Sequence, residues 1–101
     1  MAVEVAADGT FPAGRRHHSI NPRSIERIDQ GRYKVIFRHR RLHRDCFWTA
    51  AIGERGIDDA PIGLVTLNAR FGTNNGLWIR TYDLNGNDSD KPFMLKVICA
   101  N

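Results

Sequence analysis

The stretch SIERIDQGRYKVIFR, residues 24–38, decides the fold class. In its second half, Tyr33, Val35 and Phe37 occupy every other position. This period of two residues is that of a β-strand with one buried face. The sequence Asp29-Gln30-Gly31-Arg32 has the composition of a tight turn, so we expect residues 24–28 and 33–38 to pair as a hairpin.

A helix is the alternative for the first half of this stretch. Asn21 and Pro22 can cap and start a helix, Ile25 and Ile28 would share one face, and Gly31 would end it. We favour the hairpin, because the second half is strand-like.

Four more apolar segments of strand length follow, separated by Gly, Asn, Asp or Pro: residues 46–52, 62–67, 77–82 and 93–100. We expect Phe37, Phe47 and Phe93 to pack in the core. Several short strands divided by turn residues indicate an all-β fold. The sequence predicts a small antiparallel β-sandwich, jelly-roll-like in kind.

Residues 1–23 differ from the rest and predict an extended N-terminal arm, whereas residues 24–101 form the predicted β-sandwich domain. Val3 and Val5 alternate over a short strand-like stretch, but closely spaced Gly and Pro residues follow. The arm is either disordered, as many termini are, or ordered on a neighbouring copy.

The chain has 101 residues, 42% of them hydrophobic, which fits one domain. It contains no apolar run long enough for a membrane-spanning helix. The first residues lack a basic leader and an apolar segment of secretory length. We therefore expect synthesis in a cytoplasm, with exit only by assembly or lysis.

Positive charge is concentrated in one part of the chain. The net charge is +4, but residues 15–44 carry ten Arg or Lys and two acidic residues, a local net charge of +8. Such a block can bind an anionic partner or the acidic surface of a neighbouring copy. The candidate partner-binding residues are Arg15, Arg16, Arg38, Arg40, Arg41 and Arg44. Nucleic acid is disfavoured, because the aromatic residues that could stack on bases lie within the strands.

Catalytic and metal-binding patterns are weak. No serine or cysteine has a nucleophile motif, and no Gly-rich phosphate loop is present. His39, His43 and Cys46 lack a fourth ligand for zinc. In the calcium-loop pattern that starts at Asp83, Asp88 and Met94 replace the required Gly and Glu. We expect no enzymatic activity, cofactor or metal.

Two residue pairs allow further hypotheses. Trp48 and Trp78 are candidate stacking residues for a ligand such as a sugar. Cys46 and Cys99 lie in two apolar strands and form either a disulfide or two packed thiols, with an intermolecular bond as a third option.

The pattern from Ile25 to Cys99 resembles a small β-sandwich domain of bacterial proteins and tailed-phage virion proteins. The residues that carry the resemblance are Gly31-x-Tyr33-x-Val35-x-Phe37, Cys46-x-x-x-Ala50-x-Ile52-Gly53, Gly63-x-Val65, Asn75-Gly76-x-x-Ile79-x-Thr81-x-Asp83-x-x-Gly86 and Asp90-x-x-Phe93-x-Leu95-x-Val97-x-Cys99. The resemblance implies a sandwich in which Cys46 and Cys99 lie close together. Residues 38–44 and the arm depart from it.

We therefore expect a structural virion component of a tailed bacteriophage, either a capsid decoration protein or a small tail or fibre protein. It would be made in the host cytoplasm, form a homo-oligomer such as a trimer, and contact major capsid or tail proteins. One alternative is a lectin-like or surface-recognition module. The other is a nucleic-acid-binding protein that uses the basic residues 38–44.

Overall fold

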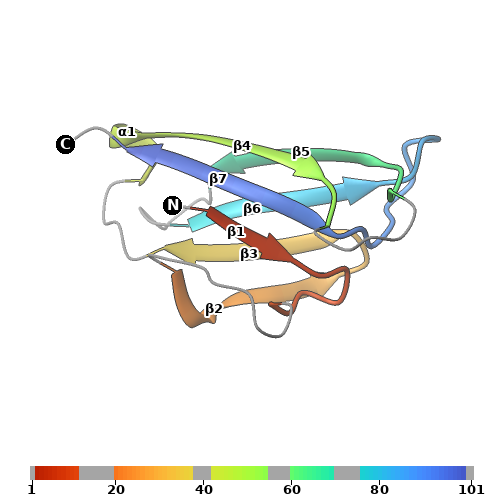
Figure 1. Cartoon of the computed structure of the whole chain (residues 1–101), viewed down its shortest axis with the longest axis horizontal. Coiled ribbons are helices and arrows are strands. Elements are labelled where there is room, and N and C mark those ends of the chain that lie inside the picture. Colours follow the sequence, from red (N-terminus) through yellow and green to blue (C-terminus); the bar gives the residue numbers. More distant parts are fainter. Residues whose placement is uncertain (1, 12–19, 38–41, 55–59, 70–75, 100–101) are drawn as a thin grey trace.

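Two antiparallel sheets packed face to face form the protein, as Figure 1 shows. The structure is a computed structural model that describes residues 2–11, 20–37, 42–54, 60–69 and 76–99. The predicted all-β class and sandwich-like architecture are confirmed.

The strands divide unequally between the sheets. The three-stranded sheet has the order β1-β7-β4, with bounds Ala2–Val5, Phe93–Cys99 and Cys46–Ile52. The four-stranded sheet has the order β2-β3-β6-β5, with bounds Ile20–Asp29, Arg32–Phe37, Gly76–Tyr82 and Leu64–Ala69. One helical turn, α1 (Leu42–Asp45), precedes β4. The chain changes sheet after β1, β3, β4 and β6.

The hairpin predicted for residues 24–38 is confirmed, and the helical alternative is wrong. β2 pairs with β3 in antiparallel register from Ile25↔Val35 to Asp29↔Arg32. Gly31 makes the turn with a φ of 69°, a conformation that other residues rarely adopt. A Cβ at this position would also lie 2.5 Å from the Thr81 carbonyl oxygen. Both facts require glycine here.

The core consists of the inward-facing residues of both sheets. β3 contributes Tyr33, Val35 and Phe37, and the Tyr33 and Phe93 rings meet edge to face with centroids 5.1 Å apart. The other buried apolar side chains are Val3, Val5, Cys46, Leu77, Ile79, Leu95 and Val97. Each buried strand residue alternates with an outward one, as the period of two predicts.

The core prediction for Phe47 is wrong. Its side chain is 83% exposed on the outer surface of the three-stranded sheet. Successive side chains of a strand point to opposite sides of the sheet. Because Cys46 is buried, the next residue of β4 points outward. The apolar run CFWTAAI concealed this alternation.

The predicted arm is wrong for its first residues. Ala2–Val5 forms β1, which pairs with β7 from Ala2↔Lys96 to Val5↔Phe93. Val3 and Val5 are buried, so this segment belongs to the core. β2 also begins at Ile20, before the predicted domain boundary. The part of the arm at residues 12–19 lies outside the described residues.

A buried hydroxyl connects three separate segments. Tyr33 donates a hydrogen bond of 2.6 Å to the Ala7 carbonyl oxygen, and its hydroxyl lies 3.4 Å from Asp90 Oδ1. The same Asp90 carboxylate accepts hydrogen bonds from the Gly31 amide at 2.6 Å and from Arg27 Nε at 2.8 Å. Asp90 thereby fastens the connection between β6 and β7 to the β2–β3 turn.

Burial, and secondly the Asp90 carboxylate, raises the pKa of Tyr33 above its ordinary value. The folded protein therefore holds the Tyr33 proton at a pH where the unfolded chain releases it. The stabilisation is complete below the ordinary tyrosine pKa and is lost as the pH rises through the folded value.

We expect Tyr33→Phe to lower the free energy of unfolding by about 1 kcal/mol at neutral pH, because one buried hydrogen bond is lost. This difference from the wild type should shrink between about pH 9 and pH 11, since the variant has no phenol to deprotonate. Urea denaturation of both proteins across this range measures it. A difference that does not change with pH would contradict the assignment.

Candidate functional site

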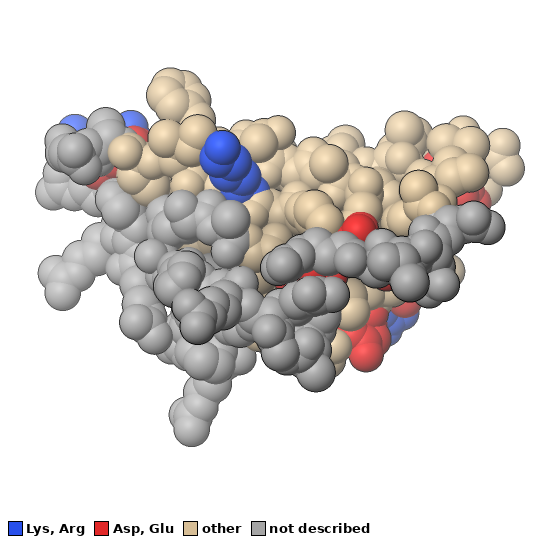
Figure 2. Space-filling model, viewed as in Figure 1, with Lys and Arg blue, Asp and Glu red and all other residues tan. Residues whose placement is uncertain are grey.

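The outer face of the three-stranded sheet is apolar. Phe47 and Ile98 are cross-strand partners on β4 and β7, and their side chains are 83% and 58% exposed. Ala51 and Met94 form another pair on the same face. Figure 2 shows the molecule from this side. Among the coloured atoms over these strands, few belong to charged side chains. The face therefore carries two apolar cross-strand pairs, separated by the Thr49–Lys96 pair, and exposed apolar side chains of this size are the kind that proteins bury against partners.

Two charged residues flank this apolar pair. Lys96 of β7 is exposed and lies opposite Thr49, and Glu4 of β1 lies opposite Met94. Because one residue is basic and the other acidic, they add no net charge to the face.

The outer face of the four-stranded sheet has different chemistry. One cross-strand row runs from Asn68 through Trp78 to Lys34, and the next runs from Thr66 through Arg80 to Arg32. On β6, Trp78 and Arg80 alternate with the buried residues Leu77, Ile79 and Thr81. Trp78 therefore lies on the outer side of β6.

The cations of this face have acidic partners. Lys34 Nζ lies 3.0 Å from Glu26, and Arg80 lies 3.0 Å from Asp88. Arg32 lies 3.9 Å from the same Asp88 carboxylate. The face consequently presents hydrogen-bonding groups with most of their charge compensated.

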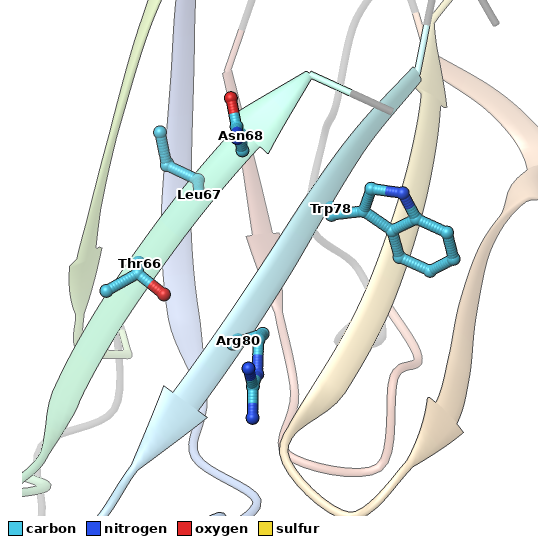
Figure 3. A pocket seen from close by; sticks show the side chains of 5 residues that line it. All are labelled: Thr66, Leu67, Asn68, Trp78 and Arg80. Carbon is cyan, nitrogen blue, oxygen red and sulfur yellow. The ribbon is translucent and has the colours of Figure 1, made fainter. Parts of the chain in front are cut away.

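Trp78 lies between two shallow hollows. Thr66, Leu67, Asn68, Trp78 and Arg80 line the first, of about 240 Å³, and Figure 3 shows these five side chains. Ile28, Arg32, Trp78 and Arg80 line the second, of about 280 Å³. Trp78 and Arg80 belong to both, so they form a ridge along β6.

The two tryptophans have different surroundings. Trp78 is 37% exposed, whereas Trp48 is partly buried and packs against the core. The alternation of side chains along a strand explains the difference. Trp48 pairs with the buried Val97 and so lies on the inner side of its sheet, whereas Trp78 lies on the outer side. Only Trp78 therefore has the position that a stacking residue requires.

Of the six predicted partner-binding arginines, the structure describes Arg44 alone. Arg44 is exposed in α1. Arg15, Arg16, Arg38, Arg40 and Arg41 lie outside the described residues, so their role as partner-binding residues stays a prediction.

Cys46 and Cys99 form a disulfide that joins the first residue of β4 to the last residue of β7. The two residues are register partners across the strands, with a sequence separation of 53. In this state neither sulfur is available as a nucleophile.

The polar loop after β6 uses its side chains for its own conformation. Asp83 Oδ1 accepts hydrogen bonds from the Asn85 and Asn87 amides at 2.9 and 3.0 Å. Within the described ranges, no three His, Cys, Asp or Glu side chains gather as a metal-ligand set. In the same part of the chain, no helix has the length and hydropathy needed to cross a membrane.

Comparison of the chain with protein-family models, with curated proteins and with solved structures found no match.

We expect reduction of the disulfide to destabilise the protein by about 4 kcal/mol, because it releases a closed loop of roughly 50 residues in the unfolded chain. Urea denaturation with and without a phosphine reductant measures this effect. The Cys46→Ala/Cys99→Ala double variant is the control and should be insensitive to the reductant. A wild-type protein that is equally insensitive would show that the bond is absent.

Proposed function

We propose that this protein is a structural, non-enzymatic component of a tailed-bacteriophage virion, as a capsid decoration protein or a small tail or fibre protein. It would act through protein–protein contacts made by the outer face of its three-stranded sheet. The observation that carries the proposal is the exposed Phe47–Ile98 pair on that face.

Burial of this pair favours association. Large apolar side chains gain about 25 cal/mol for each Å² removed from water, and aromatic residues are enriched at interfaces. A sheet face is flat enough to pack on another sheet at about 10 Å. The Phe47–Ile98 pair would occupy the centre of such a contact.

A second copy of the chain is the occupant that the face fits best. We propose a two-fold contact here in place of the trimer expected from the sequence. The same patch then meets itself, so Phe47 and Ile98 would pack against their own equivalents. Oligomers that contact a major capsid or tail protein would then gain avidity from several weak attachments.

The virion setting is supported by two observations. The pattern from Ile25 to Cys99 resembles virion β-sandwich domains, and the Cys46–Cys99 disulfide suits a protein that leaves a reducing cytoplasm. A particle component meets this condition after lysis of the host.

We expect Phe47→Ser to weaken self-association by about tenfold or more, because it removes the most exposed aromatic ring from the contact. Sedimentation velocity over a concentration series measures the dissociation constant. Leu84→Ser is the matched control, because Leu84 is also exposed but lies in the loop after β6. A wild type that stays monomeric, or equal losses in both variants, would contradict the proposed contact.

We expect the chain to copurify with virions through a density gradient, at a constant ratio to the major capsid protein. Mass spectrometry of the gradient fractions measures this ratio, with an abundant host cytosolic protein as the contamination control. Detection only in the particle-free lysate would rule out the virion assignment.

A further inference from the structure

The ridge on β6 divides the outer face of the four-stranded sheet into two sites of similar size. One hollow, of about 240 Å³, lies toward β5, and the other, of about 280 Å³, lies toward β3 and β2. Both include Trp78, whose ring extends from β6 toward β3 in Figure 3. An elongated ligand that crosses β6 could fill both hollows and cover the ring between them.

The polar groups around Trp78 suit a ligand that carries many hydroxyl groups. Asn68 and Thr66 contribute an amide and a hydroxyl on the β5 side, and each can both donate and accept hydrogen bonds. Arg80 donates to Asp88 through one nitrogen, and a guanidinium has five N–H donors in all. The Arg80 guanidinium lies over the Tyr82 ring, with its Cζ atom 5.3 Å from the ring centroid, and this cation–π contact helps to hold the guanidinium in place.

Charge compensation argues against an anionic ligand. Lys34 pairs with Glu26, while Arg80 and Arg32 share Asp88. Two acidic residues thus offset two of the three positive charges, which weakens the attraction for a phosphate or carboxylate, whereas a neutral hydroxyl needs only the remaining donors. The site therefore favours an uncharged polar chain over a nucleic acid.

We propose that this face binds a neutral polysaccharide, with one sugar ring stacked on Trp78 and neighbouring sugars in the two hollows. The C–H groups of a pyranose face pack on the indole ring, since one side of each sugar is apolar. Thr66 and Asn68 bond hydroxyls on one side of the ridge, and Arg80 and Arg32 bond those on the other. This activity is additional to the proposed protein contacts, which use the opposite sheet.

Affinity electrophoresis in native gels tests this proposal. The full chain is run in gels that contain hydroxyethyl cellulose, xylan, mannan or starch, with alginate and single-stranded DNA as the anionic arms. We expect at least one neutral polymer to retard the wild type. Trp78→Ala should lower that affinity about tenfold, while Trp78→Phe should retain part of it.

Matched variants separate a binding role from a folding role. Trp48→Phe changes the tryptophan on β4, which packs against the core, and Leu84→Ser changes an exposed residue of the loop after β6. Both should keep wild-type retardation, and urea denaturation should show that Trp78→Ala still unfolds cooperatively and is folded under the gel conditions.

Three outcomes would overturn the inference. These are no retardation in any neutral polymer, retardation only in alginate or DNA that disappears with added salt, and equal affinity of Trp78→Ala and wild type. Because self-association is measured separately with Phe47→Ser, failure here leaves the proposed virion role to be judged on its own test.

Discussion

The Tyr33 hydroxyl is the constraint on which the arrangement of the two layers depends. The ring lies in the core against Phe93 of the opposite sheet, so its hydroxyl must find partners away from water. One partner is the Ala7 carbonyl oxygen, in the segment that follows β1. The other is the Asp90 carboxylate, in the segment that precedes β7. Asp90 also holds the Gly31 amide of the β2–β3 turn. One side chain of β3 thus fixes the positions of β1, β7 and the hairpin relative to one another.

The same alternation that fills the core gives the two outer faces their different chemistry. On β4, burial of Cys46 directs Phe47 outward, and the antiparallel register places Ile98 beside it. On β6, burial of Leu77 and Ile79 directs Trp78 and Arg80 outward. One face is consequently apolar and suited to another protein, while the other combines an aromatic ring with hydrogen-bonding groups. A small domain can in this way present two separate surfaces.

The sequence predicted the strands better than it predicted their exposed sides. The β2–β3 hairpin followed from alternation and Gly31. Trp78 was named as a candidate stacking residue, but so was Trp48, which packs against the core. Phe47 was assigned to the core because nearly every residue of β4 is apolar, so composition concealed the alternation. The strand-like residues of β1 were assigned to an arm because four residues are too few to predict a place in the sheet, and the partner strand β7 lies at the other end of the chain. The hollows beside Trp78 combine residues of separate strands, so only the register reveals them.

The disulfide has a mechanical consequence. It closes the chain between residues 46 and 99, so tension applied at the two termini passes directly from one sulfur to the other. The bypassed stretch would otherwise lengthen by roughly 180 Å when fully extended. Phe47, Ile98, Trp78 and Arg80 all lie within it. These four residues therefore stay in a segment that pulling cannot extend, whereas Ile28 and Arg32 of the second hollow lie outside it and are drawn out with β2 and β3.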